Sequence, residues 1–208
     1  MTDRLDVVLE TAAPLLKRAG DVLAAAGAPA DHAVWPSLRR VRLLPWDAVQ
    51  AVAALRPYDL ADAGPELRLD ARDCAGLAET LPAPGIWSGA AADAYETSRR
   101  RMVRHLSGGE ESLDGRLSAT AALADELAAW MARARAELAV ALAEVLTSVE
   151  ALPLAAQAHS SAVDPADTSE AEAAAQVAAR VLDAVAAVYE DAADLMAAAE
   201  PLAEVRWS

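Results

Sequence analysis

The stretch IWSGAAADAY, residues 86–95, stands where a proline-rich break ends and a new helix begins. The preceding Pro82-Ala83-Pro84-Gly85 cannot continue a helix, whereas the alanines after Gly89 are the strongest helix formers. Gly89 allows a tight turn without a Cβ clash. A tryptophan between two antiparallel helices can fill the groove where they separate, which buries about 150–250 Å². The stretch therefore predicts a helix–helix corner with Trp87 as its plug.

Working outward from this corner, apolar residues recur every three or four positions in most of the chain, as expected for helices. Few segments alternate with the period of a strand. The prediction is an all-α protein, an antiparallel helical hairpin or bundle with long helices. The expected helices cover residues 3–26, 46–55, 65–81, 90–106, 114–152 and 167 onward, and residues 28–45 are expected to form a packed irregular connection with Trp35 and Trp46 as core plugs.

The two long helices carry the most regular apolar seams. A row of this kind must be buried against the same chain or another one. We therefore predict that they bind another helical chain, or a second copy, through the seam residues Leu127, Met131, Leu138, Leu142, Val181, Val185 and Val188. The last helix also begins with Asp167-Thr168-Ser169-Glu170, which is typical of an N-cap.

Composition narrows the function classes. Apolar residues make up 55% of the chain, aromatic residues only 4%, and phenylalanine is absent. The net charge of −14 argues against nucleic-acid binding, which needs a basic surface. Arginines nevertheless gather at Arg39–Arg42 and at Arg99–Arg104. These two clusters either pair with the acidic C-terminal helix inside the fold or form a basic docking patch for a partner or an anionic membrane surface.

The sequence offers no catalytic or metal-binding constellation. His32, His105 and His159 are isolated from one another, and Cys74 is the single cysteine. No glycine-rich loop with a following lysine is present to hold a phosphate. The prediction is a protein that is not an enzyme, with no metal site and no cofactor.

The chain is expected to contain four segments that together form one domain. These are an N-terminal segment of residues 1–56, a hairpin with the long helix at 57–152, a linker at 153–166 and an acidic C-terminal helix at 167–208. Charged residues near the start interrupt any apolar run of a cleaved signal peptide. No uncharged stretch reaches the length of a membrane span. A cytoplasmic location is expected, or export without a cleaved signal peptide.

With a helix before it and Ala-Ala-Ala-Asp-Ala-Tyr95 after it, the Trp87-Ser88-Gly89 turn resembles that of the WxG proteins of type VII (ESX) secretion systems. This resemblance covers residues 65–106 and implies a helical hairpin with the WxG turn at its bend. It also implies pairing with a WxG-type partner or effector, or with itself, as a secreted substrate or as an escort. The family's export signal places an acidic residue four positions after a tyrosine. Here Asp194 follows Tyr189 by five positions, which is a displaced form of that signal.

Two other functions stay open on the sequence alone. One is a small helical enzyme or ligand-binding bundle, with a pocket lined by the Trp35–Trp46 region and the Arg99–Arg104 cluster. The other is a cytosolic adaptor or structural protein unrelated to secretion.

Overall fold

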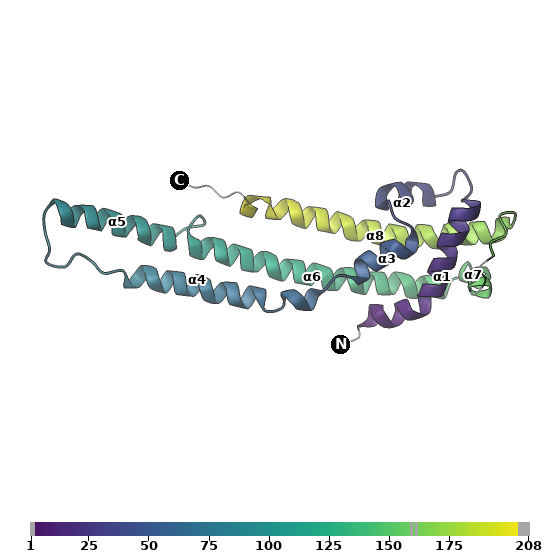
Figure 1. The fold of residues 1–208 in the computed structure, drawn as a ribbon, viewed down its shortest axis with the longest axis horizontal. Coiled ribbons are helices and arrows are strands. Elements are labelled where there is room, and N and C mark those ends of the chain that lie inside the picture. Colours follow the sequence, from purple (N-terminus) through teal and green to yellow (C-terminus); the bar gives the residue numbers. More distant parts are fainter. Residues whose placement is uncertain (1–2, 159, 161, 204–208) are drawn as a thin grey trace. The chain divides into compact units, whose positions relative to one another are not determined.

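The computed structural model describes residues 3–158, 160 and 162–203, and within these residues all regular structure is helical (Figure 1). The predicted all-α class is confirmed. The elements in chain order are α1 (Arg4–Ala26), α2 (Val34–Val41), α3 (Pro45–Ala53), the 3-10 helix η1 (Pro57–Leu60), α4 (Ala63–Thr80), α5 (Ala90–Leu106), α6 (Leu113–Leu146), α7 (Ala151–Gln157) and α8 (Thr168–Ala203).

The chain divides into two compact units. The first comprises Met1–Leu55 and Trp130–Asp194, and the second comprises Arg56–Ala129 and Leu195–Ser208. Helices α6 and α8 each contribute to both units. In the first unit, the C-terminal half of α6 shares its core with α1 and α8.

Helix α1 begins with a capping box. Asp3 accepts a hydrogen bond from the Asp6 amide (3.1 Å), and the Asp6 carboxylate accepts one from the Asp3 amide (3.2 Å). This reciprocal pair satisfies two of the amides that a helix start leaves without partners. The apolar face then runs through Leu5, Leu16 and Val22, all at most 1% exposed. The expected helix over residues 3–26 agrees with the structure.

The core of the first unit is made by apolar stripes from distant parts of the chain. Residues of α1 and α3 pack with the second half of α6 and with α8, and α7 adds Leu154. The α6 stripe continues through Leu138, Leu142 and Val145, as its spacing predicts. Burial of each such leucine or valine side chain contributes roughly 1.5–3 kcal/mol.

Residues 34–41 differ from the expectation of an irregular connection, because they form α2. Pro36 does not prevent this helix, since it lies in the first turn, where the proline nitrogen has no intrahelical acceptor to lose. Val34 and Val41 are buried one above the other. Trp35 and Trp46 are only partly buried and pack against the edge of the core rather than inside it.

The helix expected over residues 114–152 ends early, at Leu146. The Thr147 hydroxyl donates to the carbonyls of Ala143 (3.1 Å) and Glu144 (3.0 Å). In a continuing helix, backbone amides would donate to these carbonyls, so the hydroxyl competes with the next helical turn. A new helix, α7, follows at an angle of 83° to α6. It occupies a portion of the segment expected to be a linker, and His159 and Ser161 of that segment lie outside the described residues. The spacing of Leu142, Val145, Val149 and Leu152 predicts one continuous buried row. This prediction is wrong for the last two residues, because Val149 and Leu152 are 74% and 69% exposed.

Helix α8 begins as predicted, because Asp167 accepts hydrogen bonds from the Ser169 and Glu170 amides, both at 3.0 Å. The Glu170 side chain, however, is not a member of a capping box. It is buried and binds Arg18 of α1 instead.

In the second unit, α4 buries small residues at a seven-residue spacing: Gly64, Ala71 and Ala78. This spacing allows the backbone of α4 to approach its neighbour closely. A Cβ at Gly64 would collide with the carboxylate of Asp125, a residue of α6 that also pairs with Arg68. Helix α4 also contacts α5, the helix that follows the Trp87-Ser88-Gly89 turn.

Helix α5 has the expected length, and its inward face is in part the predicted one. The spacing of Ala91, Tyr95, Ser98, Met102 and Leu106 predicts a shared inward face, and of these Leu106 is buried and Tyr95 partly buried, whereas the other three are exposed. Ala92 is also buried, and Glu96, Arg99 and Val103 are partly buried. The polar members Glu96 and Arg99 can lie on this face because they pair with each other.

Candidate interaction site around the Trp87–Gly89 turn

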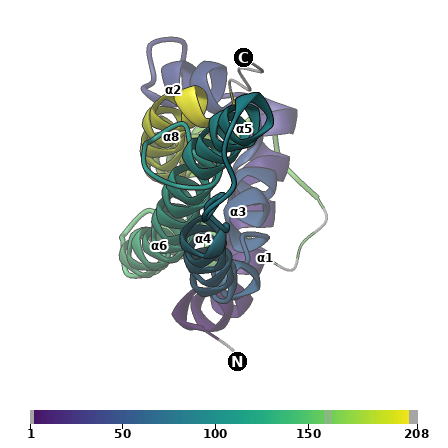
Figure 2. The ribbon, with the colours of Figure 1, turned by 90° about the vertical axis from the view of Figure 1, so that its left-hand side faces the viewer.

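Figure 2 looks onto the loop that joins α4 to α5 and contains the turn. The Trp87 amide donates to the Pro84 carbonyl (3.2 Å), which closes a tight turn around Gly85. Gly89 is the N-cap of α5, with φ +97° and ψ −180°. Residues with a Cβ rarely adopt this conformation, so the glycine is required by the backbone. No atom lies within 4 Å of the position a Cβ would take, so space is not the constraint.

Trp87 is not the buried plug that the sequence predicted. Its side chain is 50% exposed and lies against the Tyr95 ring, with 5.7 Å between ring centroids and a 45° angle between the rings. The Tyr95 hydroxyl donates to the Pro82 carbonyl (2.7 Å) and so ties the loop to the first turns of α5. Ile86 beside it is 105% exposed. The loop, which these two hydrogen bonds hold, therefore presents two adjacent apolar side chains to solvent.

The arginine cluster Arg99–Arg104 lies further along α5. Arg99 donates two hydrogen bonds to Glu96 (2.7 and 2.8 Å), and Arg100 donates one (2.6 Å). These contacts, that of Arg99 first, lower the pKa of Glu96 to about 2. The cluster is thus partly neutralised within the helix, whereas Arg101 and Arg104 extend into solvent.

The other arginine cluster, Arg39–Arg42, lies in the first unit. The Arg39 side chain donates to the Trp35 carbonyl (3.2 Å), and Arg40 forms an exposed ion pair with Glu190 of α8. The expected pairing of this cluster with the acidic C-terminal helix is therefore seen for Arg40. Arg42 ends α2 in a left-handed conformation (φ +60°) and is exposed.

Five of the seven seam residues predicted to bind a partner lie inside the first unit. Their burial against helices of the same chain leaves them no surface for a partner, which corrects that prediction. Leu127 and Met131 are partly buried. The five are Leu138, Leu142, Val181, Val185 and Val188, each at most 2% exposed.

Tyr189 and Asp194, the displaced export signal, both lie on the outer surface of α8, and Tyr189 is 38% exposed. Asp194 follows Tyr189 by five residues, so on a helix the two side chains point about 140° apart.

Two buried arginines were not predicted from the sequence as special positions. Arg18 binds Glu170, and Arg135 binds Asp3 (2.5 Å) and Asp6 (2.8 Å) and also donates to the carbonyls of Ala53 and Leu55. The sequence does contain an indication of their burial, because each arginine interrupts an otherwise apolar helix face. The sequence does not identify their acidic partners, because these lie more than a hundred positions away in the chain.

Within the described residues, no group of three histidine, cysteine or carboxylate side chains could hold a metal ion. His32 accepts a hydrogen bond from the Val34 amide at Nδ1 (3.0 Å), so its role is to begin α2. An open hollow is lined by Ala30, Trp35, Leu38 and Arg39. Trp46 does not line it; its ring lies instead under the Lys17 ammonium, 4.6 Å away.

The portion of the chain that the structure describes forms no single helix that is long and apolar enough to cross a membrane; α6 and α7 pass such a test only as a bent pair. The fold and the turn thus define an all-helical protein with two exposed apolar side chains, Ile86 and Trp87, in the loop between α4 and α5. No protein-family model, curated protein or solved structure matches this chain.

Proposed function

We propose that this chain is a non-enzymatic helical protein associated with type VII secretion, which acts as a secreted substrate or as a partner that escorts an effector through helix–helix contact. The observation that carries the proposal is the Trp87-Ser88-Gly89 turn between two contacting helices. Gly89 has the positive φ that this turn requires, and Trp87 extends to a half-exposed position beside it.

The exposure of Ile86 and Trp87 supports an interaction role for the loop. Exposed apolar patches on proteins often mark interaction sites, and these two side chains are among the large apolar residues that the structure exposes. Tryptophan is also the residue most enriched among side chains that dominate interface energies. In this proposal the partner contact is made at the loop, because the core seams of the first unit are already occupied.

Secretion is tested by following the tagged chain in the culture medium of a host with a complete type VII system and of the same host without its membrane ATPase. If the chain is a secreted substrate, we expect it in the medium. If it is an escort, we expect a co-expressed effector in the medium only when the chain is present. Both signals should disappear without the ATPase.

The role of the loop is tested with Trp87→Ala and with Leu77→Ala as the matched control, since Leu77 is a similarly exposed apolar residue of the same unit (54%). We expect Trp87→Ala alone to abolish export or escort. Export that is independent of the ATPase, or equal effects of both substitutions, would contradict the proposal.

A further inference from the structure

The outward face of α5 is basic. Arg100, Arg101 and Arg104 share this face at positions i, i+1 and i+4, and all three are exposed. Arg100 contacts Glu96, but among the described residues Arg101 and Arg104 have no ion pair or hydrogen bond from their side chains. An arginine pair without acidic partners is unexpected in a chain with 32 acidic and only 18 basic residues.

The outward face of α8 is acidic in the same pattern. Glu190, Asp191 and Asp194 also occupy positions i, i+1 and i+4, and all three are exposed. Glu190 pairs with Arg40, whereas Asp191 and Asp194 have no side-chain partner within the ranges that the structure describes. Residues 181–200 of this helix contain no lysine, arginine or histidine. The face is therefore purely acidic, unlike that of α4, where Arg68 and Arg72 lie among the carboxylates.

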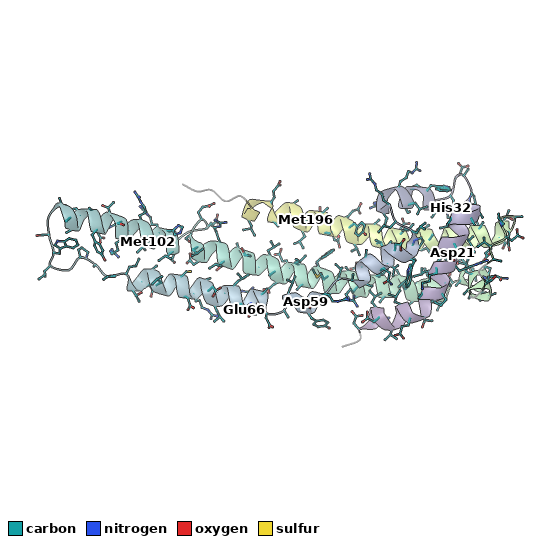
Figure 3. All side chains as sticks on the ribbon, viewed as in Figure 1. Asp21, His32, Asp59, Glu66, Met102 and Met196 are labelled. Carbon is teal, nitrogen blue, oxygen red and sulfur yellow. The ribbon has the colours of Figure 1, made fainter. Side chains whose placement is uncertain are left out.

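Each of these two helices also has an exposed methionine (Figure 3), and the turn of about 100° per residue places it on the side of the helix opposite the charged triad. Met102 on α5 is 49% exposed and Met196 on α8 is 74% exposed. The contact between the two faces would therefore be made by matched charges, which set orientation and partner choice.

We propose that the basic face of α5 in one molecule binds the acidic face of α8 in a second copy of this chain. The two triads have the same helical spacing and opposite charge, so two helices laid side by side bring three guanidinium groups opposite three carboxylates. A second copy is favoured over an anionic membrane because the net charge of −14 opposes approach to anionic lipid, whereas α8 supplies a matched acidic face. This inference does not depend on a role in secretion.

The experiment is sedimentation equilibrium of the full chain over a range of concentrations at low salt. We expect reversible self-association that weakens when sodium chloride is raised, because salt screens exposed charge pairs. The charge-reversed variants R101E/R104E and D191R/D194R should each associate about 10- to 100-fold more weakly than the wild type. An equimolar mixture of the two variants should recover association, because each then meets a complementary face.

Two controls match the change in charge without touching either face: R42E/R133E and E110R/E111R, all four residues being exposed. Both should associate like the wild type. The proposal is overturned if the wild type stays monomeric at all concentrations, if the controls weaken association as much as the face variants, or if the mixture fails to recover it. Co-sedimentation of monomeric wild type with phosphatidylglycerol vesicles, lost in R101E/R104E, would assign the basic face to lipid and also overturn it.

Discussion

Arg18 of α1 and Glu170 of α8 form a buried two-pronged ion pair, with Nε–Oε1 and Nη2–Oε2 distances of 2.7 and 2.8 Å. Their side chains are only 3% and 5% exposed. The remaining donor of Arg18, Nη1, binds the carbonyls of Ser160 (3.1 Å) and Ala162 (2.8 Å). One guanidinium thus fastens α1, the start of α8 and the segment before α8 to one another.

Replacing Arg18 with methionine is expected to destabilise the protein by about 3–5 kcal/mol, because Glu170 would remain buried without its partner. Urea unfolding followed by circular dichroism measures this. The double variant R18M/E170M should be closer to the wild type, since it removes both charges. As a control, Arg180→Ala breaks a partly exposed pair with Glu150 and should cost at most about 1 kcal/mol. Equal losses in the single and double variants would contradict the expectation.

The contact between Asp3 and Arg135 predicts a dependence of stability on pH. The hydrogen bond from Arg135 is the main cause that lowers the pKa of Asp3 in the folded protein. The resulting stabilisation is complete above the ordinary aspartate pKa of about 3.9 and is lost as the pH falls toward the folded-state value. Asp3→Asn keeps an N-cap side chain but removes the charge.

We therefore expect Asp3→Asn to lower the free energy of unfolding by about 1–3 kcal/mol at pH 6. The difference from the wild type should shrink as the pH falls below about 4. Urea titrations at several pH values provide the measurement. A difference that does not shrink as the pH falls below the ordinary aspartate range would show that the charge of Asp3 is not its cause.

Gly89→Ala is expected to destabilise the chain by about 1–3 kcal/mol, because alanine must adopt the positive φ of the turn. Gly76→Ala is the matched control: Gly76 lies inside α4 with no atom near the position of a Cβ, so alanine there should stabilise by about 0.5–1 kcal/mol. Thermal unfolding of both variants tests the pair of expectations. If both substitutions shifted the melting temperature in the same direction, the positive φ of Gly89 would not be the cause.

Leu142→Ala should lower the free energy of unfolding more than Trp87→Ala does, although tryptophan has the larger side chain. Leu142 is fully buried, so its truncation leaves a cavity and should cost about 2–5 kcal/mol. Trp87 is half-exposed and its ring contact is with Tyr95, so its loss should cost only about 0.5–1.5 kcal/mol. Chemical denaturation measures both, and a larger loss for Trp87 would mean that its ring is more buried in solution.

The helical class, the ends of most helices, the N-cap at Asp167 and the turn at Gly89 could be predicted from the sequence. These features depend on hydrogen bonds and backbone conformations within a few residues, which local sequence specifies. The glycine of the turn could be named for the same reason.

Which of these residues are buried and which face solvent became clear only from the tertiary structure. The seam residues Leu138 and Val181 are buried within their own chain, the tryptophan of the turn faces solvent, and Arg18 is inside the core because Glu170, 152 positions away, meets it there. An apolar stripe or a charged residue has the same sequence pattern whether its partner belongs to the same chain or to another. Whether such a residue is buried depends on a partner that is distant in the chain, and the local sequence does not specify that partner.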